Sequence, residues 1–207
     1  MPDFKIEKEI LKQGYSRICG IDEVGRGSWA GPVVVCATII QSNINIKEIN
    51  DSKKITKTKR DQISEKLKKE NVEFGIGKAS NKEIDRLGIM KALNIAASRA
   101  LNKLYHKPDI ILLDGTVNYI EESYKVITRK KADEKSITVA SASIFAKVYR
   151  DKLMEKIHRL NNNKYNFHKN KGYGTKEHKE KIDKNGLSSF HRKSYNITNS
   201  WKKNLVK

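Results

Sequence analysis

Four acidic side chains lie in or beside apolar stretches of this sequence, where burial of a charge is energetically unfavourable. Asp22 and Glu23 follow each other inside ICGIDEV, and Asp114 closes DIILLD. Asp133 lies in KKADEKS, ahead of a run of small residues. A buried carboxylate costs several kcal/mol unless a cation or hydrogen-bond donors compensate it. These surroundings therefore indicate that something cationic pairs with the acids.

Carboxylates that gather at one place suit metal-dependent hydrolysis. Repulsion among such acids would raise their pKa values, and bound Mg2+ or Mn2+ would remove that cost. Two such ions can activate a water and stabilise the leaving oxygen of a phosphodiester. Spacing alone does not prove that the four acids converge, because a single Asp at the end of a strand is more often a turn or cap residue.

The net charge indicates the class of partner. The chain of 207 residues carries 43 Lys and Arg against 24 Asp and Glu, for a formal charge of +19. This excess points to a polyanion, most simply nucleic acid. A lysine-rich genome would explain part of the excess, but not the acids inside apolar stretches. A carboxylate cluster in so basic a chain is the combination expected of a metal-dependent nuclease.

Other features exclude several classes of protein. No window reaches the roughly 18 consecutive apolar residues of a membrane span, and the N-terminal residues 1–14 lack the apolar core of a signal peptide. Cys19 and Cys36 lie in strand-like runs, where we expect reduced core residues rather than a disulfide or a zinc site. We therefore expect a cytoplasmic protein without membrane contact, and nothing in the polar surface calls for more than a monomer.

The elements that must position the acids alternate in type. Apolar runs predict strands at 17–24, 31–40, 72–80, 109–115 and 124–129. Helical spacing predicts helices at 81–104, at 141–160 and near 175–184. A further basic helix is expected to begin after Thr56, which would cap it. Short connections favour antiparallel pairing of the first three strands, and long crossovers favour parallel pairing of the later ones. The expected fold is a mixed α/β sheet, and reactive groups gather beyond strand ends in such sheets.

Eight ordered sequence blocks resemble the type 2 ribonuclease H family, ribonuclease HII. They are GIDEVGRG, AGPVV, DSKKIT, LLDG, ADEKS, ASASIFAKVYRD, KGYGTKEH and FHRKS, in order over residues 20 to about 195. The resemblance implies a ribonuclease H-like mixed sheet flanked by helices, with a C-terminal helical part. Residues 1–207 would form a single catalytic domain, of which about 160–207 is a basic helical extension.

The resemblance also implies an activity. The family hydrolyses RNA in RNA–DNA hybrids and nicks duplex DNA on the 5′ side of a single embedded ribonucleotide, leaving 3′-hydroxyl and 5′-phosphate ends. Its acidic positions match Asp22, Glu23, Asp114 and Asp133 here. These four would be catalytic and would bind Mn2+ or Mg2+, as two ions when the substrate is bound.

Two matched loops would read the ribose. Gly25, Arg26 and Gly27 match the family's GRG turn, which contacts the 2′-OH region through its backbone, and glycine permits such a close approach. Tyr173 in KGYGT matches the tyrosine that contacts the ribose at the RNA–DNA junction. Trp29 departs from the leucine that is common in the family, so the groove near the turn would differ.

Further side chains are expected to contact the substrate. Lys53 in DSKK would hold a phosphate, and Ser143 in SASI would line the groove. His168, His178 and His191 lack metal-ligand spacing, and we expect them to meet phosphate or solvent.

Two other functions stay open at this stage. A nucleic-acid-binding module could keep the fold without the chemistry, although acids at all four positions argue against it. A shift of its melting temperature by divalent metal would separate it from a nuclease. Another nuclease of the same fold, such as a junction resolvase, would cut without needing a 2′-OH.

Overall fold

The computed structural model describes residues 2–40, 49, 55–70 and 72–196, and within them the chain forms a five-stranded sheet in the order β3-β2-β1-β4-β5. Its strands are β1 (Ile18–Val24), β2 (Val33–Ile39), β3 (Glu73–Ala79), β4 (Ile110–Asp114) and β5 (Val126–Arg129). The first three strands pair antiparallel, whereas β4 runs parallel to both β1 and β5. The expected mixed sheet is confirmed, and β1 lies at its centre.

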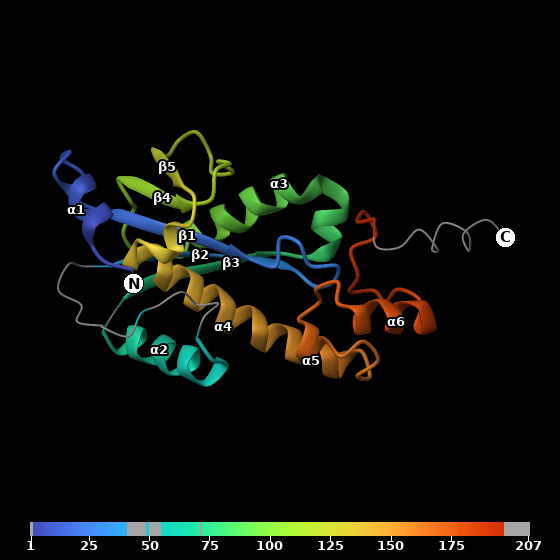
Figure 1. The fold of residues 1–207 in the computed structure, drawn as a ribbon. Helices are drawn as coiled ribbons and strands as arrows, with labels where there is room; N and C mark the ends of the chain where they lie inside the picture. Colours follow the sequence, from blue (N-terminus) through green and yellow to red (C-terminus); the bar gives the residue numbers. More distant parts are fainter. Residues whose placement is uncertain (1, 41–48, 50–54, 71, 197–207) are drawn as a thin grey trace.

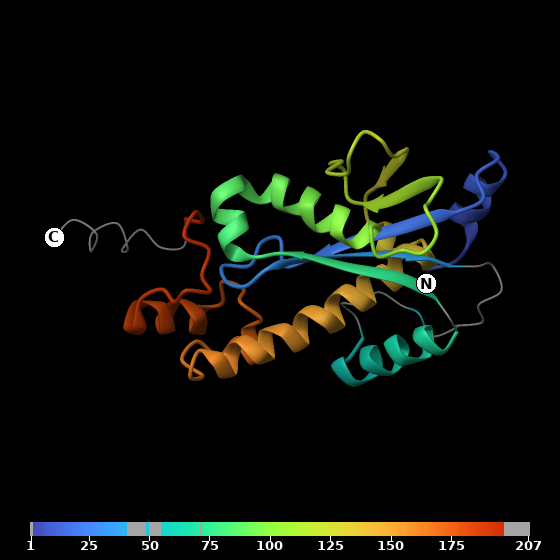
Figure 2. The ribbon, with the colours of Figure 1, turned by 180° about the vertical axis from the view of Figure 1, so that it is seen from behind.

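Helices cover both faces of the sheet. They are α1 (Lys5–Leu11), α2 (Lys57–Lys69), α3 (Asn81–Leu101), α4 (Ile137–Leu160), α5 (Phe167–Asn170) and α6 (Lys176–Asn185), with a 3-10 turn η1 (Ala132–Glu134) before α4. Figures 1 and 2 show α3 on one face and the long α4, with α2 beside it, on the other. None of the helices in the described part of the chain is long and apolar enough to cross a membrane.

Alternation along β1 and β2 feeds two separate cores. Cys19 and Ile21 pack with α3, whereas Val34 and Cys36 pack with α2 and α4. Successive side chains of a strand point to opposite faces of the sheet. Because helices cover both faces, β1 and β2 carry apolar side chains on each of them. The two cysteines are free and buried, as the sequence predicts.

Side-chain caps fix several helix starts. Thr56 accepts a hydrogen bond from the N–H of Lys59, as expected, and Ser80 forms a capping box with Glu83 at the start of α3. α4 begins at Ile137 rather than at residue 141, because Ser136 caps it earlier. The β-branched residues that follow this cap conceal the start in the sequence.

The first turn of α4 packs closely on β1. A Cβ at Gly20 would lie 2.6 Å from the backbone carbon of Thr138, so only glycine allows this contact. The short helix α1, which sequence periodicity did not indicate, supports the same turn. Its buried Glu7 accepts hydrogen bonds from the hydroxyl of Ser136 and the N–H of Thr138. The start of α4 is thus held from two sides.

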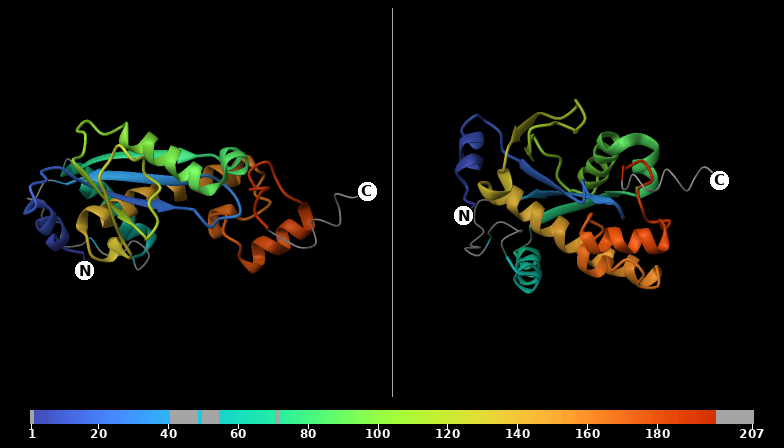
Figure 3. Two further views of the ribbon diagram at one scale, coloured as in Figure 1. Left: turned by 90° about the horizontal axis from the view of Figure 1, so that it is seen from above. Right: turned by 45° about the vertical axis from the view of Figure 1, so that its right-hand side comes forward.

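The C-terminal helices lie beyond one end of the sheet (Figure 3). They enclose a small core of their own, made of Ala30, Met154, Ile157, Tyr165, Phe167 and Ile182. Asp85 of α3 binds the last described segment, because its carboxylate accepts the N–H groups of Lys193 and Ser194. The C-terminal part is thereby attached to α3 and α4 as well as to the loop after β1.

Candidate active site

Two of the predicted acids lie side by side on neighbouring strands. The parallel pairing of Ile21 with Leu113 places Asp22 of β1 next to Asp114 of β4. The N–H of Ala132 donates to Asp114 Oδ1 at 2.7 Å, which brings η1 and its buried Asp133 to the same strand end. Strand pairing and one backbone hydrogen bond therefore gather acids that lie far apart in the sequence.

The charges of the other three predicted acids all act on Asp22. The pKa of Asp22 is raised to about 8, mainly by burial and in addition by the charges of Glu23, Asp114 and Asp133. A hydrogen bond from Ser143 of α4 acts in the opposite direction. Because charges shift a pKa strongly only at short range, Glu23, Asp114 and Asp133 all lie in the neighbourhood of Asp22.

Glu23 faces the opposite side of β1 from Asp22. The hydroxyl of Tyr119 donates to Glu23 Oε2 at 2.9 Å, and the guanidinium of Arg26 lies 3.6 Å from Oε1. Burial raises the pKa of Glu23, while Tyr119 and Arg26 lower it. Sequence reasoning missed Tyr119, because no pattern in the NYIEES loop links it to a residue 96 positions earlier.

Replacing Tyr119 by Phe tests this contact. Hydrogen bonds to charged groups contribute roughly 1.5–3 kcal/mol, so we expect kcat to fall by at least about tenfold. Hydrolysis of the substrate that the family resemblance implies, a labelled RNA–DNA hybrid, measures the change. Tyr105→Phe is the matched control, since Tyr105 is 89% exposed. An unchanged kcat in Tyr119→Phe would show that Glu23 does not need this hydroxyl.

The donor set fits a hard divalent cation that also takes oxygens from the substrate. Among the residues that the structure describes, no three His, Cys, Asp or Glu side chains are arranged to hold a metal ion by themselves. Asp22 Oδ1 and Asp114 Oδ1 each accept a backbone N–H, at 2.7 Å. Mg2+ in phosphate-processing sites commonly takes one or two carboxylates and completes its shell with water and substrate phosphate. Such a partial shell is what these acids can supply.

Two buried arginines lie against the GRG turn: Arg192 forms hydrogen bonds with it, and Arg150 packs closely on Gly25. Arg192 donates to the carbonyls of Gly25 and Arg26 at 2.6 and 2.7 Å. Gly25 has φ +87°, and a Cβ there would lie 2.1 Å from Nε of Arg150. A Cβ at Gly27 would meet no atom within 4 Å. Packing within the chain therefore requires glycine at the first position of the turn but not at the third.

Tyr173 lies on a loop that packs against the residues following the GRG turn. The carbonyl of Gly172 accepts the N–H groups of Trp29 and Ala30, at 2.7 and 3.2 Å. A Cβ at Gly174 would lie 2.3 Å from the Trp29 ring, so this tryptophan fills the space between the two loops. Tyr173 is 37% exposed. The structure thus brings the two predicted ribose-reading loops together.

The other predicted contact residues have different placements. Ser143 is buried beside Asp22, and Lys53 lies outside the described residues. His168 is exposed, but His178 and His191 are fully buried. The expectation that they meet phosphate or solvent is wrong for these two. Their neighbours Tyr165 and Phe167, which enclose them, come together only in the folded chain.

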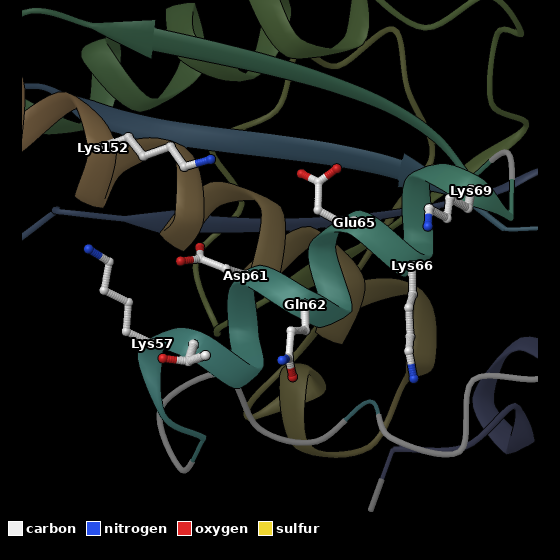
Figure 4. A pocket seen from close by; sticks show the side chains of 8 residues that line it. Lys57, Asp61, Gln62, Glu65, Lys66, Lys69 and Lys152 are labelled. Carbon is white, nitrogen blue, oxygen red and sulfur yellow. The ribbon is translucent and has the colours of Figure 1, made fainter.

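A separate groove runs along α2 (Figure 4). It is lined by Lys57, Thr58, Asp61, Gln62, Glu65, Lys66, Lys69 and Lys152. Charges of both signs alternate on its wall, and Lys57 is paired with Glu155 at 2.7 Å. None of the four clustered acids lines this groove, so it is not part of the candidate active site.

Sequence comparison gives relatives over most of the chain. The family model described as Ribonuclease HII matches residues 19–198. Ribonuclease HII of Clostridioides difficile (strain 630) is 44% identical over 190 residues, which are 91% of this chain and 73% of that protein. Ribonuclease HII of Staphylococcus aureus (strain Newman) is 45% identical over 190 residues, with the same coverage of 91% and 73%.

Solved structures give the same fold. Ribonuclease H2 from Pyrococcus horikoshii OT3 has a TM-score of 0.73 at 25% identity, covering 93% of this chain and 100% of that one. RNase HII from Archaeoglobus fulgidus, solved in complex with PCNA, has a TM-score of 0.69 at 27% identity, covering 87% and 95%. Bst-RNase HIII in complex with Mn2+ shares the fold at 20% identity and a TM-score of 0.68, covering 91% of this chain and 69% of that one.

Proposed function

Because the chain belongs to the ribonuclease HII family, whose members are endonucleases acting on RNA–DNA hybrids, we propose that it also nicks duplex DNA on the 5′ side of a single embedded ribonucleotide. The products would be 3′-hydroxyl and 5′-phosphate ends. One observation carries the proposal: the charges of Glu23, Asp114 and Asp133 all act on the buried carboxyl group of Asp22, in a protein with a net charge of +19. The basic surface would bind the duplex and the acids would act on one phosphodiester.

The four acids would hold the divalent ions, Mn2+ or Mg2+. Asp22, Asp114 and Glu23 would be the inner ligands, and Asp133 would complete the second site or position the attacking water. Bound ions would lower the pKa of the attacking water and stabilise charge on the departing 3′-oxygen. Protein donors already orient three of these carboxylates, through the N–H groups of Glu23 and Ala132 and the hydroxyl of Tyr119. The chain would therefore offer its carboxylates with little rearrangement.

The GRG turn and the Tyr173 loop would select the ribonucleotide. A 2′-OH both donates and accepts hydrogen bonds, so backbone groups close to the sugar can distinguish RNA from DNA. Gly27 supports this reading, because open space rather than packing surrounds its Cβ position. The exposed ring of Tyr173, on the neighbouring loop, would lie against the sugar at the junction. That the protein is a monomer and that it acts in the cytoplasm both stay predictions.

Cleavage of a labelled DNA duplex that carries one ribonucleotide tests the proposed function. Reactions with Mg2+, Mn2+ or EDTA run beside an all-DNA duplex of the same sequence. We expect a metal-dependent nick on the 5′ side of the ribonucleotide and none in the all-DNA duplex. Cleavage of long RNA–DNA hybrids without cleavage of this substrate would overturn the proposal, and cleavage that ignores the 2′-OH would favour a resolvase-like nuclease.

A further inference from the structure

Two buried histidines beside the Tyr173 loop have no part in the chemistry described above. His178 lies in the first turn of α6, and His191 lies in the segment that follows this helix. Both side chains are fully buried, and their Nε2 atoms are 3.1 Å apart. The rings of Trp29, Tyr165 and Phe167 surround the pair. Buried polar groups of this kind need defined hydrogen-bond partners.

The outer partners determine where each proton lies. The backbone N–H of Ser188 can only donate, so His191 Nδ1, at 2.8 Å from that nitrogen, accepts. The carbonyl of Tyr173 can only accept, so His178 Nδ1, at 2.8 Å from that oxygen, donates. A neutral His191 then carries its proton on Nε2 and donates it to the bare Nε2 of His178. With both rings neutral, this is the one arrangement that satisfies every ring nitrogen, and the Ser188 hydroxyl, also 2.8 Å from His191 Nδ1, then donates to that nitrogen as well.

Burial keeps both rings neutral in that arrangement. It lowers the pKa of His191 to about 3, with the neighbouring His178 acting in the same direction. Burial also lowers the pKa of His178, against the opposing effect of the Tyr173 carbonyl. A second proton between the two Nε2 atoms would set two donors against each other. The hydrogen bonds therefore run in one direction, from Ser188 to Tyr173.

The hydrogen bonds end at a residue that is also held from other directions. The N–H of Tyr173 donates to the carbonyl of Asn170 at 2.9 Å, and its ring centroid lies 5.4 Å from the guanidinium carbon of Arg150. The hydroxyl of Thr175 accepts the N–H of His178 at 3.2 Å, which fixes the start of α6 against the same loop. The Tyr173 carbonyl also accepts the N–H of Thr175 at 2.9 Å. Loss of the histidine bond would leave that N–H as the carbonyl's remaining partner among the described residues, while these other contacts remain.

We propose that His178 and His191 are positioning residues that form a directional hydrogen-bond relay, and that this relay holds Tyr173 in the orientation that reads the ribose. The proposal rests on the proposed function for the role of Tyr173, but the relay itself does not. A metal site is a poorer explanation, because both Nδ1 atoms already have backbone partners. Direct acid–base chemistry is excluded by the complete burial of both side chains.

The first test measures the tautomers without any activity. In protein labelled with 15N-histidine, imidazole nitrogen shifts at neutral pH report which nitrogen carries the proton. We expect His178 as the Nδ1–H tautomer and His191 as the Nε2–H tautomer, assigned with His178→Asn and His191→Asn variants. The same tautomer at both positions, or a protonated ring at either, would overturn the relay whatever the enzyme cleaves.

The second test asks whether His178 acts through Tyr173. An Asn side chain can donate from the position of Nδ1, whereas Leu cannot. For the single-ribonucleotide duplex we therefore expect His178→Leu to lower kcat/KM by about five- to tenfold, the effect of losing one hydrogen bond, and His178→Asn to retain most of it. In a Tyr173→Ala background, His178→Leu should cause no further loss.

Additive losses in that cycle would contradict a positioning role, as would equal losses in the Asn and Leu variants. His168→Leu is the control, since His168 is exposed on α5. If His178→Leu does not fold, the tautomer measurement and the His178→Asn comparison still decide. If the wild-type protein does not cut the single-ribonucleotide duplex, the proposed function fails while the tautomers continue to test the relay.

Discussion

Asp22→Asn is expected to abolish cleavage and to raise the stability of the metal-free protein. The carboxylate would be lost as an ion ligand, which removes the proposed chemistry. The amide keeps an oxygen for the N–H of Glu23, which now donates to Asp22 Oδ1 at 2.7 Å. It also ends the repulsion from Glu23, Asp114 and Asp133 that contributes to the raised pKa of Asp22. The substitution therefore removes function and a source of strain together.

The pH dependence of the stability gives the sign of this effect. The pKa of Asp22 is about 8 in the folded protein, against about 3.9 in an unfolded chain. Between these values the folded state binds a proton that the unfolded state does not, so this group lowers stability as pH rises from about 4 to about 8. Each pKa unit corresponds to about 1.4 kcal/mol. The loss is complete only above pH 8.

Thermal unfolding in EDTA measures the difference. We expect the melting temperature of the wild type to fall between pH 6 and pH 8.5, and that of Asp22→Asn to fall less. For a chain of this size each kcal/mol corresponds to about 2–4 °C. Added Mg2+ or Mn2+ should stabilise the wild type more than the variant. A variant that melts well below the wild type in EDTA at pH 8.5 would contradict the electrostatic account.

Gly25→Ala is expected to lower both stability and cleavage. Its φ of +87° costs a residue with a Cβ roughly 1–3 kcal/mol, and the new Cβ would meet Nε of Arg150 at 2.1 Å. Arg150 also donates from Nε to the carbonyl of Pro32 and from Nη1 to that of Lys171. Because it is fully buried, its displacement would loosen the GRG turn and the Tyr173 loop together. We expect a melting temperature lower by several degrees.

Gly27→Ala is the matched control for stability. Its Cβ would meet no protein atom within 4 Å, so the melting temperature should stay within about 2 °C of the wild type. If the turn lies against the ribose, Gly27→Ala should nevertheless raise KM for the single-ribonucleotide duplex. Equal melting temperatures for the two variants would show that Gly25 is not constrained by Arg150. Unchanged KM in Gly27→Ala would exclude the second glycine of the turn from the substrate contact.

The sequence by itself determined the sheet and the identity of the acids. Apolar runs with short or long connections predict strands β1 to β5 and their mixed pairing, because hydrophobic periodicity and connection length are local properties. The placement of Asp22, Glu23 and Asp114 at strand ends follows from the same runs. Ordered motifs, including the segment that carries Asp133, led to the family that the comparisons show.

Only the tertiary structure decided how those residues are supported. Tyr119 reaches Glu23 across 96 positions, and Ser143 reaches Asp22 from α4. The buried pair His178 and His191 looked like surface histidines, because a polar, glycine-rich segment gives no local sign of burial. Burial depends on which distant segments, here those that carry Trp29 and Phe167, pack around a side chain. Contacts between segments are long-range, whereas the periodicity that a sequence displays is local.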